Sequence, residues 1–317
     1  MVPRMPYAIV TAAYNEAALI EHTLRSVAAQ TVLPRAWIIV SDGSTDRTDE
    51  VAKGYEARLP FLQVIRIDRD PGRTFVSKVH AVRAGFARLA GVDYDYVGNL
   101  DADLSFGPTY FERLLEKFAA DPALGVAGGW IHEQTNGAFA PRPYNSRASV
   151  PHAVQLMRRS CYQAVGDYVA LPYGGEDTCA VIKARMAGWK AEAFADLPVQ
   201  HHRRTSSAGG VLRNRFRTGM MDHSLGYHPA YELMKCARRV VERPYAIGSV
   251  VGLAGFATAT LRRQPRPVSR DFVDFIRGEQ MQRFSALFTP RSGRQTPGGL
   301  LPSQAPGLSH AVRDRKQ

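Results

Sequence analysis

An alternation of short apolar runs with helical stretches over the first 130 residues constrains the fold of this chain more than any other feature. The apolar runs are typical of strands and occupy residues 7–13, 37–40, 64–67 and 94–100. Stretches with helical spacing of apolar residues follow them, at residues 17–30, from 48 onward, at 75–89 and at 108–120. Strands that alternate with helices of this length predict βαβ units and an α/β fold with a mostly parallel sheet. Because ligands bind beyond the carboxyl ends of such strands, we expect a site in the loops at residues 13–16, 42–46, 68–73 and 101–103.

The second half of the chain is less regular. After several prolines, order returns in helix-like segments at residues 161–165 and 176–187 and in a strand-like segment at 190–199. A helical, arginine-rich pattern covers residues 211–243, and a Pro/Gly-rich composition typical of a flexible tail covers the last 30 or so residues. We therefore expect a main domain over residues 1–220, with halves at 1–130 and 131–220, then a helical, basic and apolar extension at 221–285 and a tail at 286–317.

Basic charge is concentrated in the second half. Residues 1–140 carry 14 basic and 17 acidic side chains, whereas residues 141–317 carry 27 and 12. This distribution favours a polyanionic partner such as phosphate groups, nucleic acid or anionic lipid. Residues 244–261 contain no charge but are diluted by glycine, serine and threonine. A membrane span, contact with a membrane surface and ordinary burial all stay open for this segment.

Cysteine usage and the N-terminus bear on the compartment. The three cysteines are widely spaced and give neither a disulfide framework nor zinc-like spacing. The first apolar run soon meets Asn15 and Glu16 and shows no small-residue cleavage site, so no secretory signal is expected. We therefore expect a cytoplasmic protein, at the inner face of the cell membrane if its basic half contacts anionic lipid.

The segment Asp101-Ala102-Asp103 follows the fourth apolar run. Two carboxylates at a strand end can hold Mg²⁺ or Mn²⁺, which bridge carboxylates to phosphates, or they can divide between a ribose and a metal. The alternative is a solvated loop with two acids. Two earlier loops lie at residues 13–16 and 42–46. In the second of them Asp42 can accept hydrogen bonds from a base or ribose, and Gly43 permits a tight turn. In these loops Asn15 and Asp46 are also candidates for helix N-caps.

Three segments in this order carry a resemblance: TAAYNE at residues 11–16, SDGSTD at 41–46 and DAD at 101–103. Together they resemble the family 2 glycosyltransferases of the GT-A fold, over roughly residues 6–220. The resemblance implies an inverting enzyme that moves a sugar from a nucleotide-sugar donor, with Mg²⁺ or Mn²⁺ on the diphosphate. Residues 1–130 would bind the nucleotide and residues 131–220 the acceptor.

The same resemblance implies roles for individual residues. Asp103 would contact the metal and Asp101 the ribose side, and the nucleotide-binding set would be Ala13, Asn15, Glu16, Asp42 and Asp101. Glu176 and Asp177 in the segment GGEDT are similar to the family's acidic pair at the start of a helix below the acceptor site. An inverting transfer needs a base for the acceptor hydroxyl, and Asp177 is the candidate. The alternative is that both acids stabilise the helix through its dipole.

Histidines and cations complete the expected site. Alternation from Val199 puts His201, and not His202, on the inward face, and family members place a further metal ligand or diphosphate contact near here. A departing nucleoside diphosphate develops negative charge that cations stabilise. Arg73 and Lys78 are expected at the base or diphosphate and complete the nucleotide-binding set, and His201 is the expected metal ligand beside Asp103. Arg203 and Arg213, with Glu176, are expected at the diphosphate or acceptor.

The chain departs from the processive members of the family, which carry a Q-x-x-R-W motif and several spanning helices. Here the corresponding residues 213–216 read RNRF. We therefore expect a single sugar transfer to a lipid-linked or glycan acceptor in cell-surface or exopolysaccharide synthesis. One alternative is a nucleotidyltransferase, which usually needs a Gly-rich basic loop that residues 12–15 do not supply. Another is a non-catalytic basic module that binds lipid or nucleic acid, although no nucleic-acid motif is recognisable and no nucleic-acid partner is expected.

Overall fold

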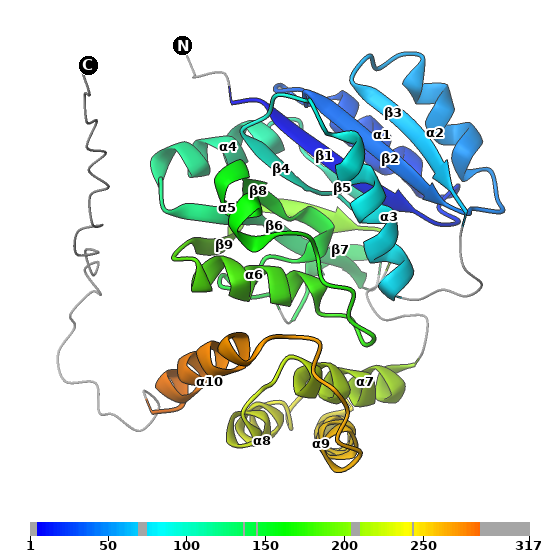
Figure 1. Ribbon diagram of the computed structural model, residues 1–317. Helices are drawn as coiled ribbons and strands as arrows, with labels where there is room; N and C mark the ends of the chain where they lie inside the picture. Colours follow the sequence, from blue (N-terminus) through cyan, green and yellow to red (C-terminus); the bar gives the residue numbers. More distant parts are fainter. Residues whose placement is uncertain are drawn as a thin grey trace, which may run out of the picture.

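The computed structural model describes residues 5–68, 75–135, 137–143, 145–203, 210–242 and 244–285 of the 317-residue chain. Within them, nine strands form one sheet in the order β3-β2-β1-β4-β8-β6-β9-β5, with β7 paired to β6 (Figure 1). The strands are β1 (Tyr7–Ala13), β2 (Ala36–Asp42), β3 (Leu62–Ile67), β4 (Tyr96–Asn99), β5 (Leu104–Phe106), β6 (Leu124–Thr135), β7 (Ala138–Pro141), β8 (Leu156–Arg158) and β9 (Lys190–His201). Arg73 and the predicted tail at residues 286–317 lie outside the described residues.

Helices cover both faces of this sheet and form a separate layer at one end (Figure 1). The sheet-covering helices are α1 (Ile20–Ala28), α2 (Thr48–Glu56), α3 (Phe75–Arg88), α4 (Tyr110–Ala120), the short η1 (His152–Val154), α5 (Arg159–Val165) and α6 (Glu176–Met186). The C-terminal layer consists of α7 (Val211–Ser224), α8 (Pro229–Arg238), α9 (Tyr245–Leu261) and α10 (Arg270–Ser285). The α/β architecture with a helical C-terminal part is the one predicted from the sequence.

The first four strands of the chain form the predicted parallel sheet. β1 lies between β2 and β4, and β3 pairs with the outer side of β2, all in parallel. Successive side chains of β1 serve both faces: Tyr7 and Ile9 pack in the cluster with α1 and α4, and Ala8 and Val10 pack in the cluster with α3. Burial on both faces explains the continuous apolar run of this strand. The polar loop residues therefore emerge at the carboxyl edge.

The second half of the sheet is mixed. β8 pairs antiparallel with both β4 and β6, and β9 runs parallel to β6. The three-residue β5 pairs antiparallel with the end of β9, so that Leu104 lies opposite His201. This pairing brings the end of β9 beside the segment that follows β4, and so joins residues almost 100 positions apart in the sequence.

The arginine-rich stretch at residues 211–243 contains two helices with a sharp turn between them. Gly226 has a φ of 80°, which favours glycine, and Pro229 starts α8, where the side chain of His228 accepts the N–H of Ala230. The predicted boundary at residue 220 falls within α7, which packs closely on α9; the division into domains itself stays a prediction. No helix in the described part of the chain is long and apolar enough to cross a membrane.

Glycines allow α7 and α9 to cross at very short range. A Cβ atom at Gly255 would lie 2.0 Å from the carbonyl oxygen of Phe216, and one at Gly219 would lie 2.0 Å from the carbonyl oxygen of Gly252. Gly255→Ala is therefore expected to destabilise the fold by about 1–3 kcal/mol, because the two helices must move apart. The matched control is Gly278→Ala in α10, where nothing lies within 4 Å; there we expect a gain of about 0.5–1 kcal/mol. Urea unfolding measures both, and equal effects at the two positions would contradict the crossing geometry.

A buried charged cluster joins α7 to α8. Lys235 pairs with both Asp222 and Glu232, whose side chains are 3% and 1% exposed. Two carboxyl groups thus share one ammonium group. Burial raises the pKa of Asp222 to about 6, with Lys235 opposing this shift and Glu232 adding to it.

This raised pKa predicts a pH dependence of stability. The native state holds the Asp222 proton more tightly than the unfolded state, so this residue stabilises the fold below about pH 4, and that contribution is lost as pH rises through about 6. Asp222→Asn is neutral at every pH and should remove about 1–3 kcal/mol of this decline. Urea unfolding at mildly acidic and neutral pH tests it against Asp274→Asn, an exposed position on α10. An unchanged decline in Asp222→Asn would refute the assignment.

Candidate active site

Asp101 lies directly beyond β4, at the carboxyl edge of the parallel sheet. Its Oδ1 atom lies 2.8 Å from Lys78 Nζ and 3.8 Å from His152 Nδ1, and it accepts a hydrogen bond from Asn99 Nδ2 at 3.2 Å. Burial opposes ionisation, but the charge of Lys78, followed by His152, holds the pKa of Asp101 well below its ordinary value. Burial also opposes the charge of Lys78, yet Asp101 and then Glu176 raise its pKa. Asp101 is therefore an anion paired with a cation from α3.

Asp103 and His201 face each other where β5 pairs with β9. Asp103 Oδ1 lies 3.2 Å from His201 Nε2, and Asp103 Oδ2 lies 3.7 Å from Arg203 Nε. Burial lowers the pKa of His201, but the hydrogen bond and charge of Asp103 outweigh it and raise the value above the ordinary one. His202 points to the other face, with Nε2 2.8 Å from Ser105 Oγ. The two histidines lie on opposite faces, as alternation along a strand requires.

Asp101, Asp103 and His201 form a group that suits a divalent cation. One ligand atom from each residue lies within 4.8 Å of the other two. Two carboxylates and one imidazole match the preferences of Mn²⁺, and a carboxylate-rich set also suits Mg²⁺, which keeps several waters. The donor chemistry therefore fits one divalent cation at the carboxyl edge of β4.

The loops after β1 and β2 are tied together beside this group. Asn15 adopts a left-handed φ of 53°, which asparagine tolerates, and its side-chain oxygen accepts the N–H of Thr45 at 2.8 Å. Asp46 accepts the N–H of Ala17 at 3.1 Å and, through its other oxygen, the N–H of Thr48 at 2.9 Å. Asp46 thus supports the start of α2 from outside the helix. The N-cap residue of α2 is Arg47, so the prediction that Asp46 is the N-cap is wrong by one position. Asn15 bonds across to the second loop instead.

Three more of the predicted nucleotide contacts lie at the same edge. Ala13 and Asp42 are buried at the ends of β1 and β2. Glu16 is also buried, and its Oε2 accepts a hydrogen bond from Arg203 Nη2 at 2.5 Å. Because Arg203 also lies beside Asp103, its guanidinium group connects the loop after β1 with the candidate metal ligands.

The acidic pair Glu176 and Asp177 forms the first turn of α6. Asp177 Oδ2 accepts the backbone N–H of His152 at 3.2 Å, and its Oδ1 accepts that of Thr178 at 2.6 Å, so the carboxylate has a fixed orientation. Glu176 is 5% exposed, and among the described residues its Oε2 finds no hydrogen-bond partner. A buried carboxylate oxygen without a partner among the described residues is a candidate for contact with a bound ligand.

Arg213 is the most solvent-exposed of the described residues predicted for the site. It is exposed on α7, near Arg217: burial and the charge of Arg213 lower the pKa of Arg217, and Glu176 acts in the opposite direction. Met221 packs on the turn before α6, with its Sδ 3.0 Å from the position of a Cβ atom at Gly175. Positions 213, 217 and 221 share one face of α7, so this face is directed toward the acidic pair.

Sequence reasoning missed His152 and Asn99, which connect the two acidic centres. His152 contacts Asp101 through its ring and Asp177 through its backbone N–H, and Asn99 donates to the His152 carbonyl oxygen at 2.8 Å. His152 lies in a proline-containing stretch without a recognisable pattern. A signal did exist for Asn99, because it is a polar residue inside an otherwise buried apolar strand.

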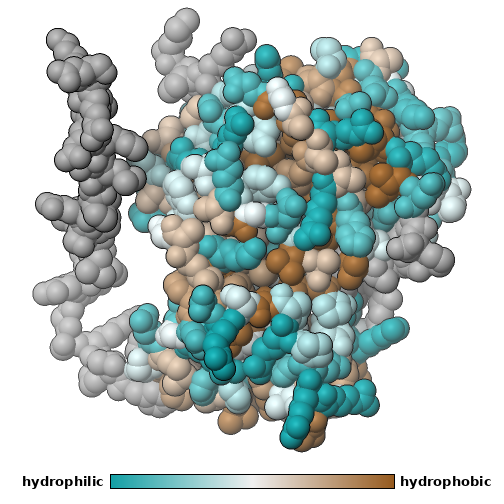
Figure 2. Space-filling view, in the orientation of Figure 1, coloured by the Kyte–Doolittle hydropathy of each residue, from teal (hydrophilic) through white to brown (hydrophobic). Residues whose placement is uncertain are grey.

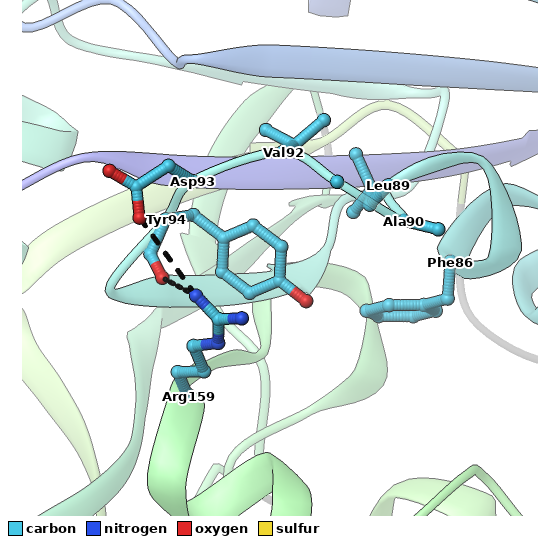
Figure 3. Close-up of a pocket in the computed structure, with 8 residues that line it drawn as sticks. Phe86, Leu89, Ala90, Val92, Asp93, Tyr94 and Arg159 are labelled. Carbon is cyan, nitrogen blue, oxygen red and sulfur yellow. Dashed lines mark hydrogen bonds and ion pairs between the residues drawn. The ribbon is translucent and has the colours of Figure 1, made fainter.

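A surface hollow of about 330 Å³ lies at the opposite end of the sheet (Figure 3). It is lined by the end of α3, the segment before β4 and Arg159, whose guanidinium lies 3.9 Å from Asp93 and donates to the Tyr94 carbonyl at 3.4 Å. In parallel sheets ligands bind at the carboxyl ends of strands, and this hollow borders the amino end of β4. It is therefore separate from the candidate active site.

Comparison with known proteins identifies relatives of this chain. The model of the family described as "Glycosyl transferase family 2" matches residues 8–171. Validoxylamine A glucosyltransferase from Streptomyces hygroscopicus subsp. limoneus is 35% identical over 123 residues, which cover 38% of this chain and 25% of that protein. Poly-beta-1,6-N-acetyl-D-glucosamine synthase from Staphylococcus aureus strain COL is 34% identical over 118 residues, 37% of this chain and 26% of that protein. The chain thus matches about a quarter of the length of these curated relatives.

Two solved structures share the fold. The mannosyltransferase PcManGT from Pyrobaculum calidifontis, in complex with GDP-Man and Mn²⁺, superposes with a TM-score of 0.53 at 17% identity, covering 90% of this chain and 81% of that one. S. aureus TarS residues 1–349, in complex with UDP-GlcNAc, gives a TM-score of 0.51 at 15% identity, covering 89% and 84%. Identities this low show a common fold and leave the ligands of this chain to be argued from its own site.

Proposed function

The chain belongs to glycosyl transferase family 2, and from this premise we propose that it transfers one sugar from a nucleoside-diphosphate sugar to an acceptor hydroxyl, with inversion at the anomeric carbon. The main support for this proposal is that His152 contacts both the candidate metal group and the candidate base. Its ring lies 3.8 Å from Asp101, a member of the candidate metal group, and its backbone N–H donates to Asp177, the candidate base. The candidate metal group and the candidate base thus both contact the same residue, His152.

Asp177 would act as the general base. The acceptor oxygen attacks the anomeric carbon from the face opposite the diphosphate, its proton passes to the Asp177 carboxylate, and the bond between the sugar and the diphosphate breaks with its electron pair on the diphosphate. The N–H groups of His152 and Thr178 already orient this carboxylate, which reduces the entropy lost on reaching the reactive geometry. Glu176, whose buried Oε2 has no hydrogen-bond partner in the described part of the chain, would position the acceptor or the sugar.

The leaving diphosphate needs positive charge. Lys78 and Arg203, each already within hydrogen-bonding distance of a site carboxylate, would supply it, and Arg213 would approach from α7. Asp103 and His201, with Asp101 beside them, would hold a divalent cation, which when bound neutralises charge on the diphosphate. Ala13, Asn15, Glu16 and Asp42 would surround the nucleoside.

The donor and the acceptor are each proposed as a chemical class. A nucleotide sugar is supported by the two fold neighbours, whose complexes contain GDP-Man and UDP-GlcNAc. The acceptor would be a glycan or lipid-linked hydroxyl in cell-surface or exopolysaccharide synthesis, which agrees with a polysaccharide synthase among the relatives. Contact with an anionic membrane would place the enzyme at the cytoplasmic face of that membrane.

A thermal-shift panel tests donor binding. UDP-Glc, UDP-GlcNAc and GDP-Man are each added with Mn²⁺, Mg²⁺ or a chelator. We expect one nucleotide class to raise Tm by about 3–8 °C at saturating concentration, because a ligand that binds only the native state stabilises it, and we expect chelator to remove most of the shift. Asp93→Asn, an exposed acid by the separate hollow, should behave as the parent chain. No shift with any nucleotide sugar in the presence of metal would contradict the proposal.

A further inference from the structure

The helix α9 buries its glycines and exposes several aliphatic side chains. Gly252 and Gly255 meet α7 at backbone contact distance, and Phe256 is the one large apolar side chain of the helix that is buried. Three aliphatic side chains face outward: Ile247 is 61% exposed, Val250 64% and Leu261 82%. Burial of apolar area normally favours the reverse arrangement. The stability of the isolated chain therefore does not explain why these aliphatic side chains of α9 are exposed.

These exposed residues form a continuous stripe, which we call the α9 face. It consists of Ile247, Val250, Ala254, Ala257 and Leu261, all exposed and spaced so that they share one side of the helix. The stripe is about 21 Å long at 1.5 Å per residue. The end of α8 continues in exposed apolar residues, including Val241 at 79%. Figure 2 shows brown surface with teal neighbours along the lower edge of the molecule, where Figure 1 places α8 and α9.

Charge around the α9 face is positive. Residues 211–263 contain nine basic and three acidic side chains. The three acids are ion-paired within the helical layer: Asp222 and Glu232 with Lys235, and Glu242 with Arg215 at 2.9 Å. Exposed arginines at positions 238, 262 and 263 lie at the end of α8 and directly after α9. An uncharged stripe with arginines near its ends is the pattern of a helix that rests in a lipid headgroup region.

We propose that the α9 face docks on an anionic lipid bilayer, with the helix in the plane of the interface, its apolar stripe toward the acyl chains and the nearby arginines at the phosphates. A helix that lies on the bilayer agrees with the finding that no described helix can cross one. A second copy of the chain is a poorer occupant, because pairing two such faces would bring like-charged arginines together. The inference goes beyond the sugar-transfer proposal and does not depend on it.

Vesicle flotation with the full chain tests the proposal. Vesicles of phosphatidylcholine alone are compared with vesicles of equal parts phosphatidylcholine and phosphatidylglycerol. We expect binding to the anionic vesicles that weakens at high salt, and a loss of at least about tenfold in partition for Val250→Glu and for Ile247→Glu. Both side chains are more than 60% exposed, so the variants should fold. Leu33→Glu, at a 49% exposed leucine between α1 and β2, is the matched control and should bind as the parent chain does.

Three results would overturn the proposal. The parent chain fails to bind anionic vesicles, or Val250→Glu and Leu33→Glu bind equally well, or light scattering shows a dimer that Val250→Glu dissociates. The last result would assign the α9 face to a second copy. The donor thermal-shift panel on Val250→Glu separates this test from the proposed function, because nucleotide binding should be unchanged in that variant.

Discussion

Asp177→Asn is expected to lower the rate of sugar transfer by about 10²–10⁴-fold, the usual contribution of a general base. The asparagine side chain keeps the size of aspartate and can still accept the N–H of His152, but it cannot take the acceptor proton. Donor affinity should change by less than about threefold, because the base acts on the acceptor and on the transition state. Initial rates of nucleoside diphosphate release in the presence of acceptor, with donor binding by calorimetry, measure the two quantities separately.

Two further variants test whether the loss of transfer is specific to the Asp177 carboxylate. Asp274→Asn on α10 removes an exposed acid far along the chain from the acidic pair and should leave the rate unchanged. Glu176→Gln distinguishes the two members of the pair, since Glu176 is the buried one and its Oε2 has no hydrogen-bond partner within the described ranges. If Glu176→Gln lost transfer while Asp177→Asn retained it, the base would be Glu176 and the assignment made here would be wrong.

Asp103→Asn should produce the second large effect, a fall of at least about 100-fold in kcat/KM together with a higher concentration of Mn²⁺ or Mg²⁺ needed for half-maximal activity. Asp103 lies between His201 and Arg203, so its loss removes one candidate ligand and leaves both side chains without the carboxylate they share. Metal titration of the transfer rate shows both changes.

The control for this substitution is Asp93→Asn, whose side chain is 89% exposed at the other end of the sheet. Its metal requirement should match that of the parent chain. Full activity of Asp103→Asn in the presence of chelator would show that the acidic group has no metal-dependent role.

The parallel half of the fold was accessible from the sequence because local patterns determine it. β1 and β2 are apolar runs that stop at polar loops, and neighbouring strand ends of a parallel sheet lie at one edge. The sequence alone therefore predicts that the loop residues Asn15, Asp42 and Asp101 lie at one edge. The support that Asp46 gives to the start of α2 also follows from its position before a helix, although the N-cap residue itself is Arg47.

The rest depends on contacts that no local pattern encodes. β5 has three residues, and its pairing with β9 brings together Asp103 and His201 across almost 100 positions. Alternation of side chains along the strand predicts which face His201 lies on. Its neighbours on that face depend on how the strands pair, which alternation does not predict. His152 belongs to an irregular segment whose path is set by the surrounding core. The exposed stripe of α9 could not be predicted from composition, because an uncharged run is compatible with a membrane-spanning helix, a membrane-surface helix or a buried helix.

The stereochemistry of the product reports whether the chain transfers the sugar with inversion at the anomeric carbon. The full chain is incubated with an α-linked nucleotide sugar from the class that stabilises it, Mn²⁺ and a hydroxyl acceptor, and NMR follows the anomeric proton while the released nucleotide is quantified. We expect a β-linked product and one nucleoside diphosphate for each sugar transferred, with both signals lost in Asp177→Asn. An α-linked product, or release of pyrophosphate from a nucleoside triphosphate and a sugar phosphate, would contradict this expectation.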